Sequence, residues 1–276
     1  MENRVVYEYM MNTLGINNPF GAPVYYKETV SSTMDEARLL AARLSPHGTV
    51  ISAGFQESGR GRTRGRPWNA DRGKNLFFTI IFRYPEISRI PRAITLRTGL
   101  ALSLAVEDFE PLLLGHTRVK WPNDLMIFDR KAAGILTEAE GGTVYTGIGV
   151  NVAQSVFPAP LKAKATSLFL AREEARHSSP PGPEPEAGAC LSLLERILPR
   201  LYGEFNALPS EADAWRKPLT ERLYRRGGRV RFLSGGAETG KPVEGVLAGI
   251  GTEGELLILP EGERECRSFV TGELMF

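Results

Sequence analysis

The densest cluster of residues able to do chemistry is the segment from Gly59 to Trp68, which reads GRGRTRGRPW. Its four arginines occupy every second position: Arg60, Arg62, Arg64 and Arg66. A guanidinium group keeps its charge and offers a planar fork of donors that matches carboxylates and phosphates. Because four like charges repel one another, we expect a loop that is mobile when empty and closes over an anion. The alternative is a solvated basic surface loop.

Two further segments carry polar side chains that could bind a ligand. Ser32 and Thr33 stand at the start of a predicted helix, where hydroxyls and free N–H groups hold anionic or polar groups, or simply cap the helix. KWPNDL, from Lys120 to Leu125, sets a lysine and an indole before a rigid turn. In that turn, Asn123 and Asp124 offer a donor, acceptors and a negative charge.

Two predicted strands contain small residues at which a ligand could lie against the backbone. RKAAGILTE runs from Arg130 to Glu138, and in it Lys131 opens the predicted strand and is followed by two alanines and Gly134. A lysine in this position is ordinarily an exposed charge at a sheet edge. In TGIGVNV, Gly147 and Gly149 alternate on one face and leave a flat floor, and Asn151 ends the strand. Glycines weaken a strand, so their presence indicates a close approach by another group.

The chemistry of these segments depends on Lys, Arg, Asp and Asn. The three histidines, His47, His116 and His177, are isolated in sequence, so they suggest neither a metal site nor a histidine-based triad. No Walker A motif is present. This composition favours stabilisation of negative charge on phosphoryl and carboxylate oxygens over acid–base hydrolysis.

The bulk composition indicates a globular protein with local positive charge. The chain has 276 residues, 42% of them hydrophobic and 24% charged, and a formal net charge of +2. This near-neutral total argues against a nucleic-acid-binding module. Cys190 and Cys266 are far apart in the sequence, as expected in a reducing compartment. The N-terminus lacks the apolar core of a signal peptide and no stretch has the length of a membrane span, so we expect a cytoplasmic protein.

The periodicity of apolar residues predicts an α+β fold with a mixed sheet flanked by helices. Helices are expected at 31–44, 94–109 and 190–208. Strands are expected at 24–27, 49–55, 75–82, 117–121, 125–128, 133–139 and 144–152. Residues 161–187 lose this pattern.

Two domains are predicted. Residues 1–225 form the main domain, with an N-terminal extension at 1–23 and an exposed, mobile Pro-rich loop at 177–187. Residues 226–276 contain short apolar runs joined by Gly-rich turns, which is typical of a small β-barrel of SH3-like size.

Taken in order, these motifs resemble the bacterial biotin protein ligases, the biotin–[acetyl-CoA-carboxylase] ligases. SSTMDEA, FQESGRGRTRGRPW, KWPNDL, RKAAGILTE and TGIGVN are each similar to a motif of that family, and the resemblance extends over about residues 24–276. It implies a sheet like that of class II aminoacyl-tRNA synthetases and a C-terminal SH3-like barrel. It also implies activation of biotin with MgATP to biotinyl-5′-AMP and transfer of biotin to a lysine of a biotin carboxyl carrier domain.

The resemblance assigns a role to each matching position. Biotin would contact Ser32, Thr33, Gln56, Gly59, Arg60, Lys131, Gly134 and Gly147. ATP and its AMP portion would contact Arg62, Trp68, Lys120, Asn123, Asp124 and Asn151, with Trp68 against the adenine. Catalysis would depend on Lys131, Arg60 and Arg62, which neutralise charge as carboxylate and α-phosphate meet. The Mg²⁺ would arrive with ATP, and no protein ligand is assigned to it.

The sequence departs from the family in two places. Thr63 and Arg64 separate Arg62 from Gly65, where the family has one residue, so Arg64 competes with Arg62 for the inner contacts. Only about twenty residues precede the first predicted strand, too few for the winged helix of relatives that act as repressors. We therefore expect the enzyme-only type, which does not bind DNA.

Three alternatives remain open at this point. A lipoate or octanoyl ligase would use a similar strand-borne lysine, but its expected R-R-x-x-G-G-G segment is absent. The others are a nucleic-acid-binding module and a biotin sensor without ligase activity. A weak homodimer is a further expectation, because an exposed sheet edge could pair with a carrier or a second subunit.

Overall fold

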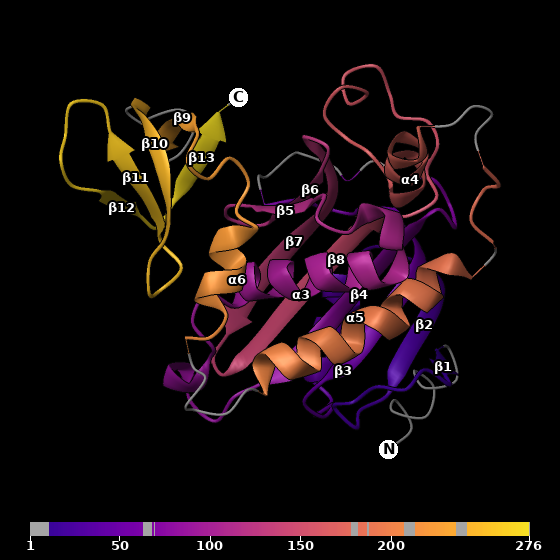
Figure 1. The fold of residues 1–276 in the computed structure, drawn as a ribbon. Helices are drawn as coiled ribbons and strands as arrows, with labels where there is room; N and C mark the ends of the chain where they lie inside the picture. Colours follow the sequence, from indigo (N-terminus) through magenta and orange to yellow (C-terminus); the bar gives the residue numbers. More distant parts are fainter. Residues whose placement is uncertain are drawn as a thin grey trace.

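The computed structural model describes residues 11–62, 68, 70–177, 182–186, 188–206, 213–235 and 242–275. Two sheets organise these residues (Figure 1). The strands of the large, eight-stranded sheet are β1 (Asn12–Leu14), β2 (Val24–Val30), β3 (Thr49–Gln56), β4 (Asn75–Arg83), β5 (Thr117–Lys120), β6 (Asp124–Ile127), β7 (Arg130–Glu140) and β8 (Thr143–Asn151). The helices are α2 (Thr33–Ala41), α3 (Ile94–Phe109), α4 (Leu168–Arg176), α5 (Ala189–Phe205) and α6 (Arg216–Glu221), with short 3₁₀ turns η1 (Ile87–Arg89) and η2 (Pro111–Leu113).

The large sheet is mixed, with the strand order β1-β2-β3-β4-β8-β7-β6-β5. Its β2–β3 pair is parallel and its other pairs are antiparallel. Hairpins join the last four strands in sequence, as the tight connections in the sequence predict. The predicted α+β class with a mixed sheet is confirmed.

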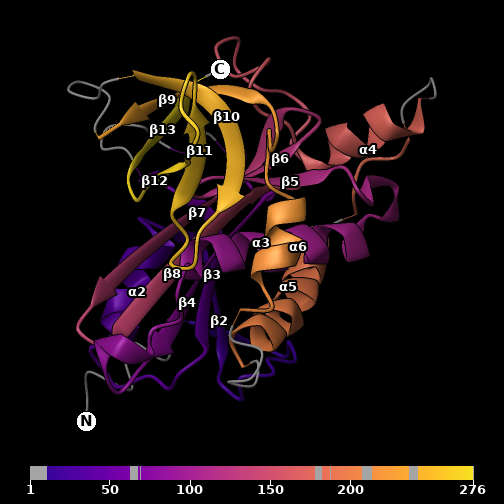
Figure 2. The same cartoon turned by 60° about the vertical axis from the view of Figure 1, so that its left-hand side comes forward.

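Alternate residues along the central strands pack against different helices. On β4, Phe78, Ile80 and Phe82 join the large core that α3 and α5 cover, whereas Ile81 belongs to a smaller cluster under α2. This period of two is what a strand buried on both faces requires. Figure 2 shows α2 on the opposite side of the sheet from α3 and α5. Helix α2 covers only part of its face, and the remainder is available for a pocket.

The second sheet has five antiparallel strands in the order β12-β11-β10-β9-β13. Its strands are β9 (Arg229–Ser234), β10 (Pro242–Ile250), β11 (Leu256–Pro260), β12 (Arg267–Phe269) and β13 (Gly272–Met275). They lie within the predicted C-terminal barrel and are compatible with an SH3-like fold. The domain boundary at residue 225 stays a prediction.

Trp121 connects the two sheets. Its indole nitrogen donates a 3.0 Å hydrogen bond to the carbonyl of Gly254, and its ring centroid lies 5.8 Å from that of Phe232 in β9. Both rings belong to one continuous hydrophobic cluster that also includes residues of α3, α5 and α6. The C-terminal sheet is therefore packed on the main sheet through a shared core.

The prediction that residues 161–187 lack a regular pattern is wrong, because they contain helix α4. Ser167 caps this helix, because its Oγ accepts a 3.1 Å hydrogen bond from the Leu170 N–H. The signal was present in the sequence as a capping serine before a run of helix-forming residues. The short helix α6 and strand β1 were also missed. Of the Pro-rich loop, residues 177 and 182–186 are described and belong to neither a helix nor a strand.

No helix in the described part of the chain is both long and apolar enough to cross a membrane.

Candidate active site

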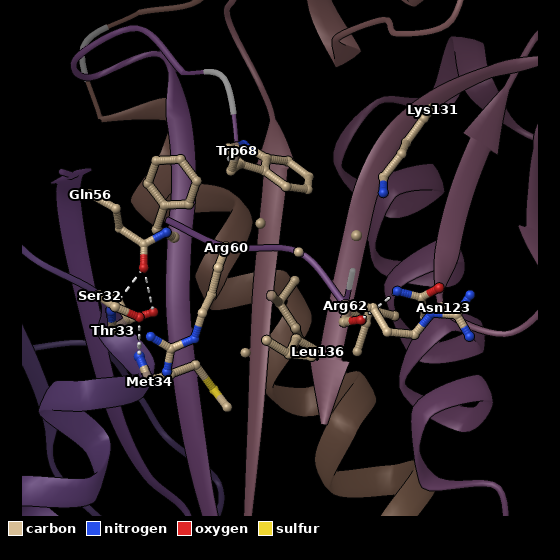
Figure 3. Close-up of a pocket in the computed structure, with 17 residues that line it drawn as sticks. Ser32, Thr33, Met34, Gln56, Arg60, Arg62, Trp68, Asn123, Lys131 and Leu136 are labelled. Carbon is tan, nitrogen blue, oxygen red and sulfur yellow. Dashed lines mark hydrogen bonds between the residues drawn. The ribbon is translucent and has the colours of Figure 1, made fainter. Parts of the chain in front are cut away.

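A pocket lies on the α2 face of the large sheet, between the start of α2 and the beginning of β7 (Figure 3). The residues that line it are Ser32, Thr33, Met34, Gln56, Arg60, Gly61, Arg62, Trp68, Phe77, Asn123, Lys131, Gly134, Ile135, Leu136, Gly147, Ile148 and Gly149. Ten of the predicted site residues are thus brought together from segments far apart in the sequence. Ser32, Thr33 and Gln56 gather at the α2 end, where the Arg60 guanidinium also lies against Asp35 (Figure 3). Lys131 and Arg62 lie at the other, cationic end.

The α2 end is a hydrogen-bonded cluster around Thr33. The Oε1 atom of Gln56 accepts hydrogen bonds from the Thr33 N–H at 2.8 Å and from its hydroxyl at 3.0 Å. That hydroxyl accepts in turn from Thr79 at 2.9 Å. The Oγ atom of Ser32 caps α2 by accepting from the Met34 N–H. Gln56 at the end of β3 is thereby held against the start of α2, so the cluster has a fixed geometry.

Glycines make the floor of the pocket, as their spacing predicts. Gly134 of β7 and Gly149 of β8 are cross-strand partners. Gly147 lies on the same face of β8, two residues before Gly149. A Cβ atom built on Gly134 would lie only 2.8 Å from Trp68 Cζ3, and one on Gly147 only 2.8 Å from Met34 Sδ. A side chain at Gly134 would force the Trp68 ring to move, and one at Gly147 would force the flexible Met34 side chain to shift.

Lys131 reaches the pocket because β7 contains an irregularity. The β6–β7 register shifts between Leu125, which pairs with Ala133, and Met126, which pairs with Lys131. Strict alternation would put Lys131 and Gly134 on opposite faces, since they are three residues apart. The extra residue, Ala132, is fully buried. This β-bulge turns the lysine toward the pocket, where its Nζ atom would lie 3.1 Å from a Cβ built on Gly134.

The Lys131 ammonium group lies close to Asp124 and Trp68. Its Nζ atom is 2.7 Å from Asp124 Oδ1 and 5.4 Å from the centroid of the Trp68 ring. The indole packs edge-on against Phe77, at a centroid distance of 6.4 Å. Within the described part of the chain, the buried Trp68 Nε1 has no hydrogen-bond partner. An acceptor on a bound molecule would satisfy it.

Lys120 of β5 lies just behind the Lys131 ammonium group, at a position where a positive charge is disfavoured. Burial lowers the pKa of Lys120, and the charges of Lys131 and Arg62 act in the same direction. The carboxylates of Asp124 and Glu273 oppose this shift. The cationic end of the pocket therefore carries a surplus of positive charge, for which an anion would compensate.

The two described arginines of the loop have different partners. Arg60 binds both carboxylate oxygens of Asp35 on α2, at 2.8 and 3.2 Å, and this hydrogen bonding raises the pKa of Arg60. Arg62 donates a 3.3 Å hydrogen bond to the carbonyl of Gly272, where β13 begins. Arg64 and Arg66 lie outside the described residues, so the competition between Arg62 and Arg64 stays open.

Four predicted site residues do not line the pocket. Gly59 closes the neck of the loop, since its carbonyl accepts from the Trp68 N–H at 3.0 Å. Lys120 and Asp124 lie behind Lys131. Asn151 is only 4% exposed, and both ends of its amide are hydrogen-bonded within the protein. The ATP contacts expected of Lys120, Asp124 and Asn151 stay predictions.

Several lining residues were missed in the sequence. Met34, Phe77 and Leu136 supply apolar walls beside the glycine floor. Phe77 pairs with Gly149, and Leu136 pairs with Gly147, so the same two-residue alternation that identified the glycines could have identified them. Met34 follows the predicted helix start directly.

The arrangement suits a molecule with a polar head, an apolar middle and an anionic tail. Fixed cations stabilise charge that develops when two anionic groups meet, without any proton transfer by the protein. The described residues contain no cluster of three or more His, Cys, Asp or Glu side chains that could hold a metal ion.

Known proteins that resemble this chain support the interpretation of the pocket as a site for such a molecule. A model of the biotin/lipoate A/B protein ligase family matches residues 26–155. The bifunctional ligase/repressor BirA of Bacillus spizizenii is 37% identical over 163 residues, which are 56% of this chain and 48% of that protein. The chain thus spans about half the length of this relative.

Two other proteins match over most of the chain. The biotin–[acetyl-CoA-carboxylase] ligase of Paracoccus denitrificans is 30% identical over 240 residues, which are 82% of this chain and 90% of that protein. The solved biotin protein ligase from Aquifex aeolicus in complex with biotin and ATP has a TM-score of 0.72 at 24% identity. The match covers 91% of this chain and 97% of the Aquifex chain, so the two proteins share one fold. On the sequence match to the Paracoccus protein, the chain belongs to the biotin protein ligase family.

Proposed function

We propose that this chain is a biotin protein ligase that attaches biotin to a lysine of a biotin carboxyl carrier domain. In the first step a carboxylate oxygen of biotin attacks the α-phosphorus of MgATP. A P–O bond to pyrophosphate breaks, and biotinyl-5′-AMP forms. In the second step the amine of the carrier lysine attacks the acyl carbon, an amide bond forms, and AMP leaves.

The observation that carries this proposal is the placement of Lys131 above the glycine floor, opposite the Thr33–Gln56 cluster. Biotin laid along the floor puts its ureido ring at the polar end and its carboxylate at Lys131. Two anions repel each other as they meet, so the positive charges of Lys131, Arg60 and Arg62 lower the barrier by positioning and by electrostatic stabilisation.

The polar end favours biotin over lipoate, the alternative acid. A ureido group has two N–H donors and a carbonyl acceptor, and Ser32, Thr33 and Gln56 supply hydroxyl and amide groups that can satisfy them. The dithiolane ring of lipoate has none of these groups. Burying the polar cluster against that ring would leave hydrogen bonds unmade, which costs about 1–3 kcal/mol for each buried group.

The nucleotide would lie at the cationic end of the pocket. We assign the adenine to Trp68 and the phosphates to Arg62, Lys120 and Asn123. Mg²⁺ prefers oxygen ligands and keeps several waters, so it would arrive with the phosphates of ATP. The carboxylate of Asp124 is the described group beside Lys131 that suits such an ion, and ATP would supply the remaining oxygens.

The partner would be a biotin carboxyl carrier domain, and its modification tests the function. The protein is incubated with MgATP, biotin or lipoate, and a carrier domain, whose mass is then measured. We expect the mass to rise by one biotinyl group, and not to rise when the acceptor lysine is replaced by arginine. Attachment of lipoate in preference to biotin would assign the alternative function.

Oligomeric state and cellular location are separate questions. We propose a weak homodimer, since the large sheet has a short edge strand, β1, that could pair with a second copy. Gel filtration with and without biotin plus MgATP tests this, and an unchanged monomer peak under both conditions would exclude the dimer. The cytoplasmic location expected from the sequence stays a prediction.

A further inference from the structure

Lys131 is anchored by backbone contacts with a segment outside the sheet. Its N–H donates a 2.8 Å hydrogen bond to the carbonyl of Lys164, and its carbonyl accepts a 2.9 Å bond from the Thr166 N–H. Together these form an isolated parallel bridge between Lys131 and Ala165. The β7–β8 pairing begins only at Ala133. Residues 164–166 therefore take the place of a neighbouring strand for the lysine.

This segment is attached to the sheet by Asn151, the last residue of β8. The Nδ2 group of Asn151 donates a 2.9 Å hydrogen bond to the Thr166 carbonyl. Its Oδ1 accepts a 3.0 Å bond from Nδ2 of Asn75, the first residue of β4 and the cross-strand partner of Asn151. The Oδ1 of Asn75 accepts in turn from the Asp71 N–H at 3.2 Å.

Both amides are buried, with Asn75 at 1% and Asn151 at 4% exposure. A buried network whose donors and acceptors are all paired is rigid, because each lost bond leaves an unsatisfied group in a medium of low dielectric constant. The path runs from the segment that follows the arginine loop, through two asparagines, to the peptide groups of Lys131.

We infer that Asn75 and Asn151 are positioning residues for Lys131. They act through residues 164–166, which hold the lysine at the start of the bulge and so keep its ammonium group over the glycine floor. Misplacement of a catalytic group by about 1 Å can reduce a rate by about 100-fold. This inference rests on the proposed function, in which the Lys131 ammonium neutralises the reacting anions.

A double-mutant cycle tests the inference. The variants are Asn151→Ala, Lys131→Ala and the double variant, and the measured quantities are the rate of biotin adenylation and the KM for biotin. We expect Asn151→Ala to reduce kcat by about 10- to 100-fold. The KM for biotin should change by a smaller factor than kcat, because the Thr33–Gln56 cluster, which would bind the ureido ring, is unchanged. In the Lys131→Ala background the same change should cost less than about threefold.

Gln154→Ala is the matched control. Gln154 is fully buried and its Oε1 accepts a 3.2 Å bond from Asn75, but it lies on a side branch that does not lead to Lys131. The Gln154→Ala variant should lower the melting temperature about as much as Asn151→Ala does, and its kcat should stay within about twofold of the wild-type value. Equal losses of kcat in the two variants, or full additivity of Asn151→Ala with Lys131→Ala, would overturn the inference.

Hydrogen exchange gives a readout that does not depend on activity. We expect the backbone amides of Lys131 and Thr166 to exchange faster in Asn151→Ala than in the wild type, and at the wild-type rate in Gln154→Ala. Unchanged exchange in Asn151→Ala would refute the positioning role. A wild-type protein that adenylates no acid would refute the proposed function instead, and the exchange result would still decide the structural part.

Discussion

Arg60 and Lys131, which line the pocket, and Lys120, which lies behind it, differ in their surroundings, and these differences suggest different tasks. Arg60 is held by Asp35 at the side of α2, where it can exchange a protein carboxylate for that of a substrate. Lys131 lies over the floor beside Asp124. Lys120 is half-buried behind it, with its pKa lowered by burial. Of these three, Lys131 is thus the one that lies directly over the glycine floor, where we place the reacting groups.

Lys131→Ala should leave the fold intact and remove most of the adenylation activity. The side chain ends in the pocket, and its removal leaves the backbone bonds to residues 164–166 in place. Loss of one group that stabilises transition-state charge costs about 100- to 1000-fold in kcat. Turnover is compared with that of Lys162→Ala, which removes an exposed lysine nearby. Near-normal turnover by Lys131→Ala would mean that the catalytic lysine has been misassigned.

The lowered pKa of Lys120 predicts a pH dependence of ATP binding. Lys120 loses its proton at a lower pH than a free lysine does, and the loss removes a positive charge that attracts phosphate. The KM for MgATP should therefore rise with pH, beginning below the pKa of a free lysine. Lys120→Arg keeps its charge throughout, so its KM should rise less over the same range. Identical profiles for wild type and Lys120→Arg would show that Lys120 does not bind the nucleotide.

At the scale of elements, two strands and one helix start create the pocket. The glycines of β7 and β8 lower the floor, the bulge in β7 turns Lys131 onto it, and α2 supplies the polar end. Each feature depends on backbone geometry, so small changes in side-chain volume on the floor should have large effects on activity.

Gly134→Ala tests this dependence. The added methyl group would lie 2.8 Å from Trp68 Cζ3 and 3.1 Å from Lys131 Nζ, so one or both side chains must move. We expect adenylation to fall by at least about tenfold with little change in melting temperature. Gly203→Ala is the control, since the position lies in α5 and its Cβ would meet no atom within 4 Å. Equal activities of the two variants would contradict the proposed floor.

Most elements of the fold could be predicted from local patterns, because alternation and helical periodicity act over a few residues. The predicted helix at 94–109 matches α3, and the glycine floor follows from strand alternation. The bulge could not be predicted, since it depends on how β6 pairs with β7. The same holds for Asn151, whose amide is engaged by Asn75 and Thr166 from distant parts of the sequence.

At the scale of the whole molecule, the C-terminal sheet takes part in both the core and the site. Phe232, Leu247 and Ile250 belong to the same hydrophobic cluster as the main sheet and α3. The Gly272 carbonyl receives Arg62 of the arginine loop. Contacts between residues 210 positions apart leave no trace in a local sequence pattern, so the apolar runs and Gly-rich turns of residues 226–276 predicted the strands but not the contact with Arg62.

The shared core predicts that both sheets unfold together. Separation of the C-terminal sheet would expose Trp121 and its apolar neighbours, which are now buried. Differential scanning calorimetry should therefore show one transition, with the calorimetric enthalpy equal to the van't Hoff enthalpy. Two resolved transitions would indicate that the C-terminal sheet is an independent unit.

Release of pyrophosphate from MgATP tests the central claim most directly. The wild-type protein is assayed with biotin, with lipoate and with neither. We expect release that requires biotin and stalls after about one turnover, until a carrier domain accepts the activated group. Release that lipoate supports better than biotin, or no release with either acid, would contradict the assignment of this site to biotin activation.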